Sequence, residues 1–298
     1  MLISICMCTY KREHLRDTLN SIARLAVPKG ATIEVLVVDN DELLSAKTIT
    51  DSFQGHFPYP LHYHSEPEKN IAAARNKLLE KARGDWIASI DDDEVADDLW
   101  LFRLKDTADF YGADVVFGHV IPSYPDNTPQ WIRDGDFFSR KTHETGTVVS
   151  RGGSGCTFIN RLFLEKNNMK FDVAYGTTGG EDVQLFYRMH RLGAKLVFCE
   201  DAIVYEAVES KRLNINYLTK RAVRIGQTYA RYRLENATVK QKLVFLVKNT
   251  VLLFGVTVIS ILSYPLRKHV FVKFYLNAMD RYGKVASVLS NKKVEMYK

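Results

Sequence analysis

The sequence predicts an α/β fold with a mixed, mainly parallel central sheet and a helical extension at the C-terminus. Two patterns carry this prediction. Through the first part of the chain, short uninterrupted apolar runs alternate with segments of helical periodicity, as in parallel sheets that are covered on both faces. Beyond Lys211 the pattern becomes helical and basic. We therefore expect one α/β domain at residues 1–210 and a helical region at 211–298.

The first half of the chain is expected to alternate strands and helices in order. Apolar runs predict strands at 2–8, 33–38, 61–64, 86–90 and 113–118. Helices are expected from the spaced apolar residues Leu15, Leu19, Ile22 and Leu25, from the alanine-rich segment 70–83 with Gly84 as its C-cap, and at 98–111.

The second half begins with a loop-rich segment. Prolines and glycines punctuate residues 119–160, which suits a substrate loop region with short strands. Helices are then expected at 160–166 and 181–192, and strands at 195–199 and 203–205.

Composition bounds the class of protein. With 298 residues, of which 46% are hydrophobic, the chain is long enough for a substantial core. Much of the net charge of +6 lies after Lys211, which indicates anionic partners there. The four cysteines form no CxxC pair, so a zinc site is not expected and a reducing cytosol fits. The apolar start of the chain meets Lys11 and Arg12 at once, which favours a first strand over a signal peptide.

Four adjacent carboxylates form the most informative feature. Asp91, Asp92, Asp93 and Glu94 directly follow the apolar run 86–90. Neighbouring carboxylates repel one another unless a cation lies among them, and hard oxygen ligands suit Mg²⁺ or Mn²⁺. Ligands of open α/β sheets bind at the carboxyl ends of the strands, where this cluster is expected. The alternative is a solvated acidic turn that caps the next helix.

Other polar residues follow the expected strands at the same edge of the sheet. Thr9, Tyr10 and Arg12 follow the first strand, Asp39 follows the second, and the segment 70–76 opens the helix before the fourth. Taken singly, Asp39 reads as a turn residue and Arg75 as part of a solvated helix face.

Together these segments resemble the family 2 glycosyltransferases of the nucleotide-sugar GT-A type. The matching pieces occur in family order over about residues 1–206, and the stretch from GGED to VYEAVESKR is most similar to the bacterial succinoglycan-type glucosyltransferases. The pieces are ISICMCTYKR, VLVVDN, NIAAARN, WIASIDDDE, GGSGCTFINR and GGEDVQLFYRM. The resemblance implies a Rossmann-like GT-A fold.

The resemblance also implies site residues. It places Thr9, Tyr10 and Arg12 beside the nucleotide, Asp39 at the uracil, and Arg75 and Asn76 near the ribose and diphosphate. Asp91 and Asp93 match the DxD motif, with Asp92 toward the ribose and Asp93 as a direct ligand of Mg²⁺ or Mn²⁺. Gly153 to Cys156 would line the sugar and acceptor pocket, and Asp182 would be the catalytic base.

Two of these positions have competing interpretations. Glu181 and Asp182 also suit the N-terminus of a helix, where acids complement the helix dipole. Many family members carry a histidine in the late strand that completes the metal site, whereas this chain has Tyr205 and Glu206. Glu206 is either a third metal ligand or a surface residue.

The C-terminal region contains an uncharged stretch from Asn249 to Leu266, bounded by Lys248 and by Arg267 and Lys268. Its length is near the lower limit for a spanning helix, and Pro265 weakens that interpretation. We favour a segment that spans or lies on a membrane over a buried packing helix, with the flanking cations on an anionic cytoplasmic leaflet.

These features predict a metal-dependent inverting transferase at the cytoplasmic face of the inner membrane. The donor would be a UDP-sugar, UDP-glucose or a relative, and the acceptor a saccharide or lipid-linked saccharide in bacterial exopolysaccharide or lipopolysaccharide-type synthesis. One alternative is a sugar nucleotidyltransferase, which would be expected to have a glycine-rich phosphate loop after the first strand, where this chain has CTYKRE. The other is an inactive membrane-tethered saccharide-binding protein. The basic residues form no nucleic-acid-binding module.

Overall fold

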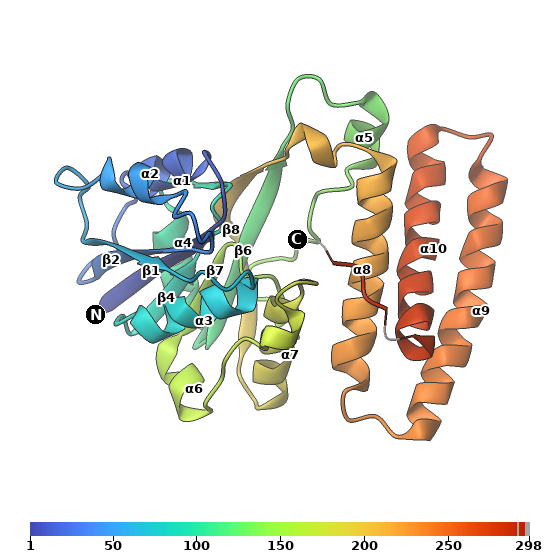
Figure 1. Ribbon diagram of the computed structural model, residues 1–298. Helices are drawn as coiled ribbons and strands as arrows, with labels where there is room; N and C mark the ends of the chain where they lie inside the picture. The colour runs from blue at the N-terminus through green and yellow to red at the C-terminus, as the bar shows by residue number, and fades with distance from the viewer. Residues whose placement is uncertain (291, 296–298) are drawn as a thin grey trace. The chain divides into compact units, whose positions relative to one another are not determined.

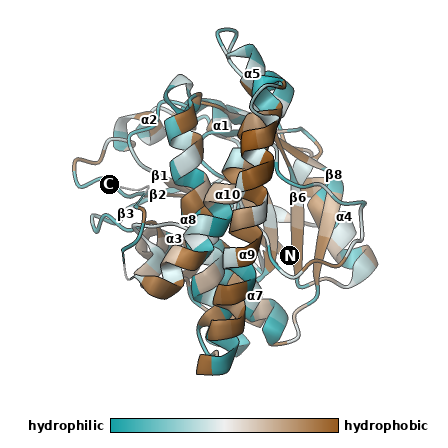
Figure 2. Ribbon diagram, turned by 90° about the vertical axis from the view of Figure 1, so that its right-hand side faces the viewer, coloured by the Kyte–Doolittle hydropathy of each residue, from teal (hydrophilic) through white to brown (hydrophobic). Residues whose placement is uncertain are grey.

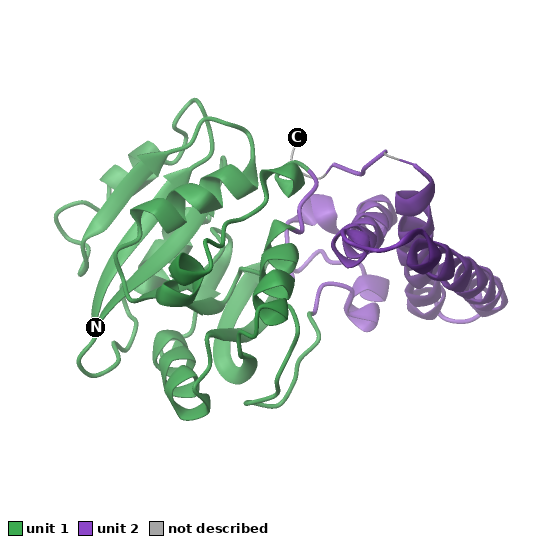
Figure 3. Cartoon of the chain, turned by 90° about the horizontal axis from the view of Figure 1, so that it is seen from below, with its two compact units in different colours: residues 1–123, 140–177, 181–207 green, residues 124–139, 178–180, 208–298 purple. Residues whose placement is uncertain are grey.

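The computed structural model describes residues 1–290 and 292–295. The chain folds as two compact units, shown in green and purple in Figure 3. Unit 1 comprises residues 1–123, 140–177 and 181–207, and unit 2 comprises residues 124–139, 178–180 and 208–298. The second unit thus takes two short segments from within the expected first domain, and the expected division at residue 210 stays a prediction.

Unit 1 is built on one mixed sheet in the order β3-β2-β1-β4-β7-β6-β8-β5 (Figure 1). The strands β1 to β4 pair in parallel, β7 is antiparallel to both its neighbours, β6 and β8 are parallel, and β5 closes the edge antiparallel to β8. The strands are β1 (Leu2–Thr9), β2 (Thr32–Asp39), β3 (Leu61–Ser65), β4 (Trp86–Ser89), β5 (Glu94–Ala96), β6 (Val115–Ser123), β7 (Thr157–Asn160) and β8 (Leu196–Ala207).

Helices cover both faces of the sheet. Since alternate residues of a strand point to opposite sides, an uninterrupted apolar strand packs against the helices on both faces. On one face, β1 residues such as Ile3 and Ile5 pack against α1 (Leu15–Ile22), α2 (Lys47–Asp51) and α4 (Trp100–Tyr111). On the other face, Cys6 packs in a cluster with α3 (Ile71–Lys81), α6 (Arg161–Lys166) and α7 (Glu181–Arg191). The apolar runs of the sequence are thus buried from both sides, as predicted.

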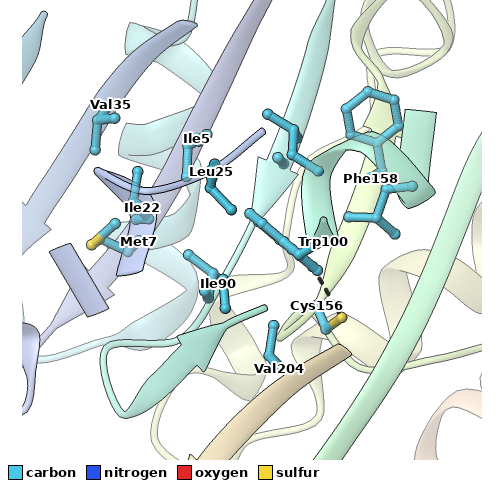
Figure 4. Close-up of a cluster of buried hydrophobic side chains, with 14 of the residues drawn as sticks. Ile5, Met7, Ile22, Leu25, Val35, Ile90, Trp100, Cys156, Phe158 and Val204 are labelled. Atoms are coloured by element: carbon cyan, nitrogen blue, oxygen red, sulfur yellow. Dashed lines mark hydrogen bonds between the residues drawn. The ribbon is translucent and has the colours of Figure 1, made fainter. Parts of the chain in front are cut away.

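Trp100 lies at the centre of the first of these clusters (Figure 4). It is fully buried, and its indole Nε1 donates a hydrogen bond of 3.2 Å to Sγ of Cys156. Cys156 is therefore a packing residue, and all four cysteines are free thiols.

Unit 2 consists mainly of helices. Its long helices are α8 (Ile215–Leu234), α9 (Val239–Ser263) and α10 (Lys268–Leu289), and its short elements are α5 (Gln130–Gly135) and the 3-10 turn η2 (Ser210–Arg212). A second 3-10 turn, η1 (Val173–Tyr175), belongs to unit 1. Glycines bring α8 and α10 close together, since a Cβ at Gly283 would lie 2.1 Å from the Val223 carbonyl oxygen. A small apolar core includes Ile132, Phe138 and Leu218.

The structure confirms the α/β class and most of the expected elements. It differs in detail: β8 runs unbroken where two strands were expected, and α2, α5 and β5 were not foreseen. The prediction that Gly84 caps a helix was wrong, because α3 ends at Lys81 and Ala82 is already extended. Gly84 instead lies against β1, where a Cβ would be 2.5 Å from the Ser4 backbone nitrogen.

Candidate functional site

The four carboxylates form a tight turn between β4 and β5. The Asp91 backbone nitrogen donates to Oε2 of Glu94 at 2.9 Å, which closes the turn. Glu94 then begins β5 and pairs directly with Glu206 of β8 in the antiparallel register. Neither a solvated turn nor the cap of α4 describes this arrangement, because Asp92, Asp93 and Glu94 are all buried.

Three arginines from separate segments neutralise this acidic turn. Arg12, which follows β1, places Nη1 3.2 Å from Oδ2 of Asp93. Arg75 of α3 places Nη2 3.3 Å from Oδ1 of Asp91. Arg140 lies between the facing pair, 3.0 Å from Glu206 and 3.5 Å from Glu94. The expected neighbours Arg12 and Arg75 are therefore at the acidic turn.

Two carboxyl groups of the turn nevertheless ionise less readily than usual. Burial raises the pKa of Asp92 to about 7, and the neighbouring charge of Asp93 adds to the shift. Burial also raises the pKa of Glu94 well above its usual range, with the Asp91 charge as the next cause and Arg140 opposing it. Buried carboxylates in this condition are stabilised by an added cation.

The donor chemistry of the turn fits Mg²⁺ or Mn²⁺, since Asp91, Asp93 and Glu206 offer carboxylate oxygens. Among residues 1–290 and 292–295, however, no three His, Cys, Asp or Glu side chains are grouped closely enough to hold a metal ion. In this conformation each of the three carboxylates is paired with a different arginine.

The segment Gly153–Gly155 lies beside both the acidic turn and Asp182. A Cβ at Gly155 would lie 2.4 Å from Oε1 of Glu94 and 2.8 Å from Oδ2 of Asp91. At the other end, a Cβ at Gly153 would lie 3.4 Å from Oδ2 of Asp182. The Ser154 backbone nitrogen donates to that same oxygen at 3.2 Å. Asp182 and Asp91 therefore flank one short segment of backbone.

Arg75 ties the start of α7 to the acidic turn. Its guanidinium group pairs with Glu181 through Nη1 and with Asp91 through Nη2. Burial would lower the pKa of Arg75, but the charges of Glu181 and Asp91 raise it, so the group stays charged. Glu181 is thus the residue that anchors the α7 N-terminus, which leaves the adjacent Asp182 as a separate carboxylate near Gly153.

Asp39 is fully buried at the end of β2 and organises the loop that follows. Its Oδ2 accepts from the Ala46 backbone nitrogen at 2.8 Å and from the Tyr63 hydroxyl at 2.9 Å. Its Oδ1 accepts from the Asp41 backbone nitrogen. The uracil-reading role of Asp39 stays a prediction; in this conformation the carboxylate is engaged with its own chain.

Two other residues expected at the nucleotide, Thr9 and Tyr10, lie at the end of β1 and directly after it. Thr9 is buried at the end of β1, where its carbonyl oxygen accepts from the Asn40 backbone nitrogen at 2.9 Å. Tyr10 is partly exposed, with the ammonium groups of Lys11 and Lys69 5.1 and 5.3 Å from its ring centroid. An exposed ring with cations over it offers a surface for an anionic, aromatic ligand.

Asn76, which was expected near the ribose and diphosphate, is also engaged with its own chain, and its role there stays a prediction. Both ends of its side-chain amide bond the backbone of Phe171, at 2.9 and 2.8 Å. It also lines a cavity of about 600 Å³ between α3 and α6, which none of the residues 91–94 lines. The sequence missed Arg140, because that residue lies in the loop-rich segment and carries no motif of its own.

Comparisons with known proteins agree with this fold. Residues 4–167 match the model of the family "Glycosyl transferase family 2". The succinoglycan biosynthesis protein ExoM of Rhizobium meliloti is 36% identical over 240 residues, which cover 79% of this chain and 76% of that protein.

Solved structures show the same fold at low identity. A structure of S. aureus TarS 1-349 in complex with UDP-GlcNAc has a TM-score of 0.55 at 16% identity, covering 100% of this chain and 93% of that one. A structure of GalNAc-T7 with UDP, GalNAc and Mn2+ has a TM-score of 0.58 at 17% identity, covering 80% of this chain and 51% of that one. On the sequence evidence, the chain belongs to glycosyl transferase family 2 and is a glycosyltransferase.

Proposed function

We propose that this enzyme is a metal-dependent, inverting transferase that moves a sugar from a UDP-sugar, UDP-glucose or a close relative, to a saccharide acceptor. The similarity to a succinoglycan biosynthesis protein supports bacterial exopolysaccharide or lipopolysaccharide-type synthesis, with a lipid-linked saccharide as acceptor. The likeness to a protein solved with UDP-GlcNAc supports a UDP-sugar donor.

One observation carries the proposal: Asp182 and Asp91 lie at opposite ends of the Gly153–Gly155 segment. A transferase needs positive charge where the diphosphate departs and a base where the acceptor hydroxyl attacks. A carboxylate at one end and an acidic turn with arginines at the other provide these two functions within one short stretch of backbone.

The residues of this chain divide the work accordingly. Arg12 and Arg75 are already held at the acidic turn and would stabilise the charge that develops on the leaving diphosphate. Tyr10 would lie beside the nucleobase of the donor. Asp182 would accept the proton of the acceptor hydroxyl as that oxygen attacks the anomeric carbon. A single base on the face opposite the leaving group gives inversion.

Asp91 and Asp93, with Glu206 as third ligand, would hold Mg²⁺ or Mn²⁺. A bound divalent cation would supply positive charge to the β-phosphate oxygens of the donor. The raised pKa values of Asp92 and Glu94 indicate carboxyl groups whose ionised forms a cation would stabilise, which supports this assignment, and so does the oxygen-only donor set.

We place the enzyme at the cytoplasmic face of the inner membrane. Among the residues that the structure describes, one helix, α9, is long and apolar enough to cross a membrane, and little of its apolar stretch is buried. A lipid-linked acceptor would be presented at the same surface.

The reaction is tested with purified protein, a panel of UDP-sugars and an oligosaccharide acceptor, with Mg²⁺ or Mn²⁺ and then with EDTA. We expect one donor to give UDP and an acceptor extended by one sugar of inverted anomeric configuration, with turnover lost in EDTA and in Asp93→Ala. Asp201→Asn, an exposed residue of β8, is the control and should retain activity. Release of pyrophosphate would show a nucleotidyltransferase and contradict the proposal.

A further inference from the structure

Helix α9 buries polar side chains and exposes apolar ones. Its inward side carries Asn249, Ser260 and Ser263, which are 3–4% exposed. The Asn249 side-chain oxygen accepts from Arg281 of α10 at 3.2 Å, and the Ser263 hydroxyl donates to the Ser260 carbonyl at 2.8 Å. A helix that packs its polar residues against its neighbours would leave its apolar residues without cover in water.

The side of α9 that points away from α8 and α10 is apolar over most of its length (Figure 2). Its residues recur at helical spacing and are 39–74% exposed. We call this the outer face of α9, and it consists of Val244, Val247, Val251, Phe254, Val258 and Leu262. At about 25 cal/mol per Å² of apolar surface, a contiguous face of this kind favours an apolar environment.

The charged residues around α9 indicate what kind of surface the outer face of α9 contacts. From Asn236 to Met279 the chain contains no aspartate or glutamate. Three lysines lie on α9, and Arg267 and Lys268 follow it; all five side chains are exposed. The lysines are Lys240, Lys242 and Lys248. Cations at the margins of an apolar face match an anionic lipid surface, where each contributes favourably near the headgroups.

The neighbouring helix decides the orientation. Helix α10 packs beside α9 and carries Lys273, Asp280, Arg281 and Lys284. If α9 crossed the bilayer, α10 would either follow it, with these charges in the hydrocarbon region, or be torn from it. Lys248 also lies within α9, so the uncharged stretch runs only over residues 249–266, which is near the lower limit of length for a span. A helix in the plane of the surface avoids both costs.

We propose that α9 binds an anionic membrane as an in-plane helix, with its outer face immersed among the acyl chains and its cations at the headgroups. Helix α10 then stays on the water side of α9. This inference rests on the proposed function for the location of the enzyme at a membrane, and it specifies the mode of attachment and the lipid class.

Vesicle flotation of the full chain tests the binding, without donor or acceptor. We expect flotation with vesicles of phosphatidylcholine and phosphatidylglycerol, and much weaker flotation with phosphatidylcholine alone. Val251→Glu/Phe254→Glu should abolish flotation. The matched control Phe110→Glu, which changes an exposed apolar residue of α4, should not. Lys240→Gln/Lys242→Gln/Lys248→Gln should weaken partitioning on the order of a hundredfold, while the fold is untouched because these side chains are exposed.

Depth measurements test the orientation. A fluorophore is attached at Val244→Cys, Phe254→Cys or Leu262→Cys, one at a time, and quenched by spin-labelled lipids of graded depth; the unsubstituted chain gives the background. An in-plane helix gives the same depth at all three positions. A deep Phe254 with shallow ends would overturn the proposal in favour of a span.

Two further outcomes separate this inference from the enzymatic one. A chain that does not float but forms a dimer broken by Val251→Glu/Phe254→Glu would show that a second copy covers the outer face, and would overturn the proposal. Transfer to a soluble acceptor by a chain that does not float would also overturn it while leaving the proposed sugar-transfer reaction intact. Flotation without transfer would contradict only the function.

Discussion

At the scale of single residues, arginine–carboxylate pairs determine both the site and the frame that supports it. At the site, Arg12, Arg75 and Arg140 each pair with part of the acidic turn. Away from it, Glu34 of β2 is 2% exposed and accepts hydrogen bonds from the Ser4 hydroxyl at 2.6 Å and from Arg83 at 2.7–2.9 Å. A buried carboxylate with this many donors stabilises the sheet only while it is ionised.

Glu34→Gln should reveal this dependence through pH. Burial would raise the pKa of Glu34, but the hydrogen bonds from Ser4 and Arg83 lower it below its usual value. Because the folded pKa is depressed, the stabilisation is present above the ordinary glutamate pKa and is lost as the pH falls through the folded value. We expect Glu34→Gln to lower the free energy of unfolding by roughly 2 kcal/mol near neutral pH, and by much less in acid.

Urea unfolding of both chains across the acid range gives the measurement. Glu200→Gln, an exposed residue of β8, is the control and should change little at any pH. An equal loss for Glu34→Gln at neutral and acid pH would show that shape, and not charge, explains the contribution of Glu34.

The sequence indicated some of the residues around the acidic turn but not others. Polar residues after successive strands indicated that Asp91, Asp93 and Arg12 lie at one edge, because parallel strands bring their carboxyl ends together, whereas Arg75 of α3 was singled out by the family resemblance. Arg140 has no such signal, since its place beside Glu94 and Glu206 depends on how a long loop folds back. The hydrogen bond from Tyr63 to Asp39 likewise depends on how β3 lies beside β2.

At the scale of elements, the glycine segment 153–155 is the part on which the proposed site depends most. It precedes β7, the strand that joins the parallel and the remaining strands of the sheet. The sequence indicated a loop here, but not that backbone would pack directly on carboxylates. Short strands such as β5 were also missed, because three residues carry too little periodicity to separate a strand from a turn.

Gly155→Ala should impair catalysis by displacing the acidic turn. The new Cβ would lie 2.4 Å from Oε1 of Glu94 and 2.8 Å from Oδ2 of Asp91, so these carboxylates must move. We expect the transfer rate to fall at least tenfold, on the order of the cost of misplacing reacting groups by a fraction of an ångström.

Gly153→Ala is the comparison, since its Cβ would meet Arg140 at 3.3 Å and Asp182 at 3.4 Å and needs only small adjustments. Steady-state kinetics of both variants, with circular dichroism to verify folding, give the result. A Gly155→Ala enzyme with unchanged kinetics would show that the position of the acidic turn does not matter for the reaction.

At the scale of the whole molecule, the sequence indicated the architecture better than the division of the chain. Alternating apolar runs predicted the α/β class, because a covered parallel sheet leaves a strong local pattern. The second compact unit draws on residues 124–139 and 178–180, which carry no compositional signal of belonging with the C-terminal helices. The apolar stretch was visible in sequence, but the direction in which α9 turns its polar residues is set by packing against α10.

The account as a whole depends on Asp182 acting as the base beside the acidic turn. Asp182→Asn keeps the size of the side chain and removes its basicity, so the expected effects on binding and on chemistry separate.

The most direct measurement is single-turnover transfer by Asp182→Asn together with its affinity for the donor. The account predicts a transfer rate reduced about 10²–10⁴-fold, as is typical for loss of a general base, with the donor Kd nearly unchanged. Transfer at the parental rate by Asp182→Asn, with the donor bound as before, would contradict the assignment of Asp182 and with it the mechanism proposed for this enzyme.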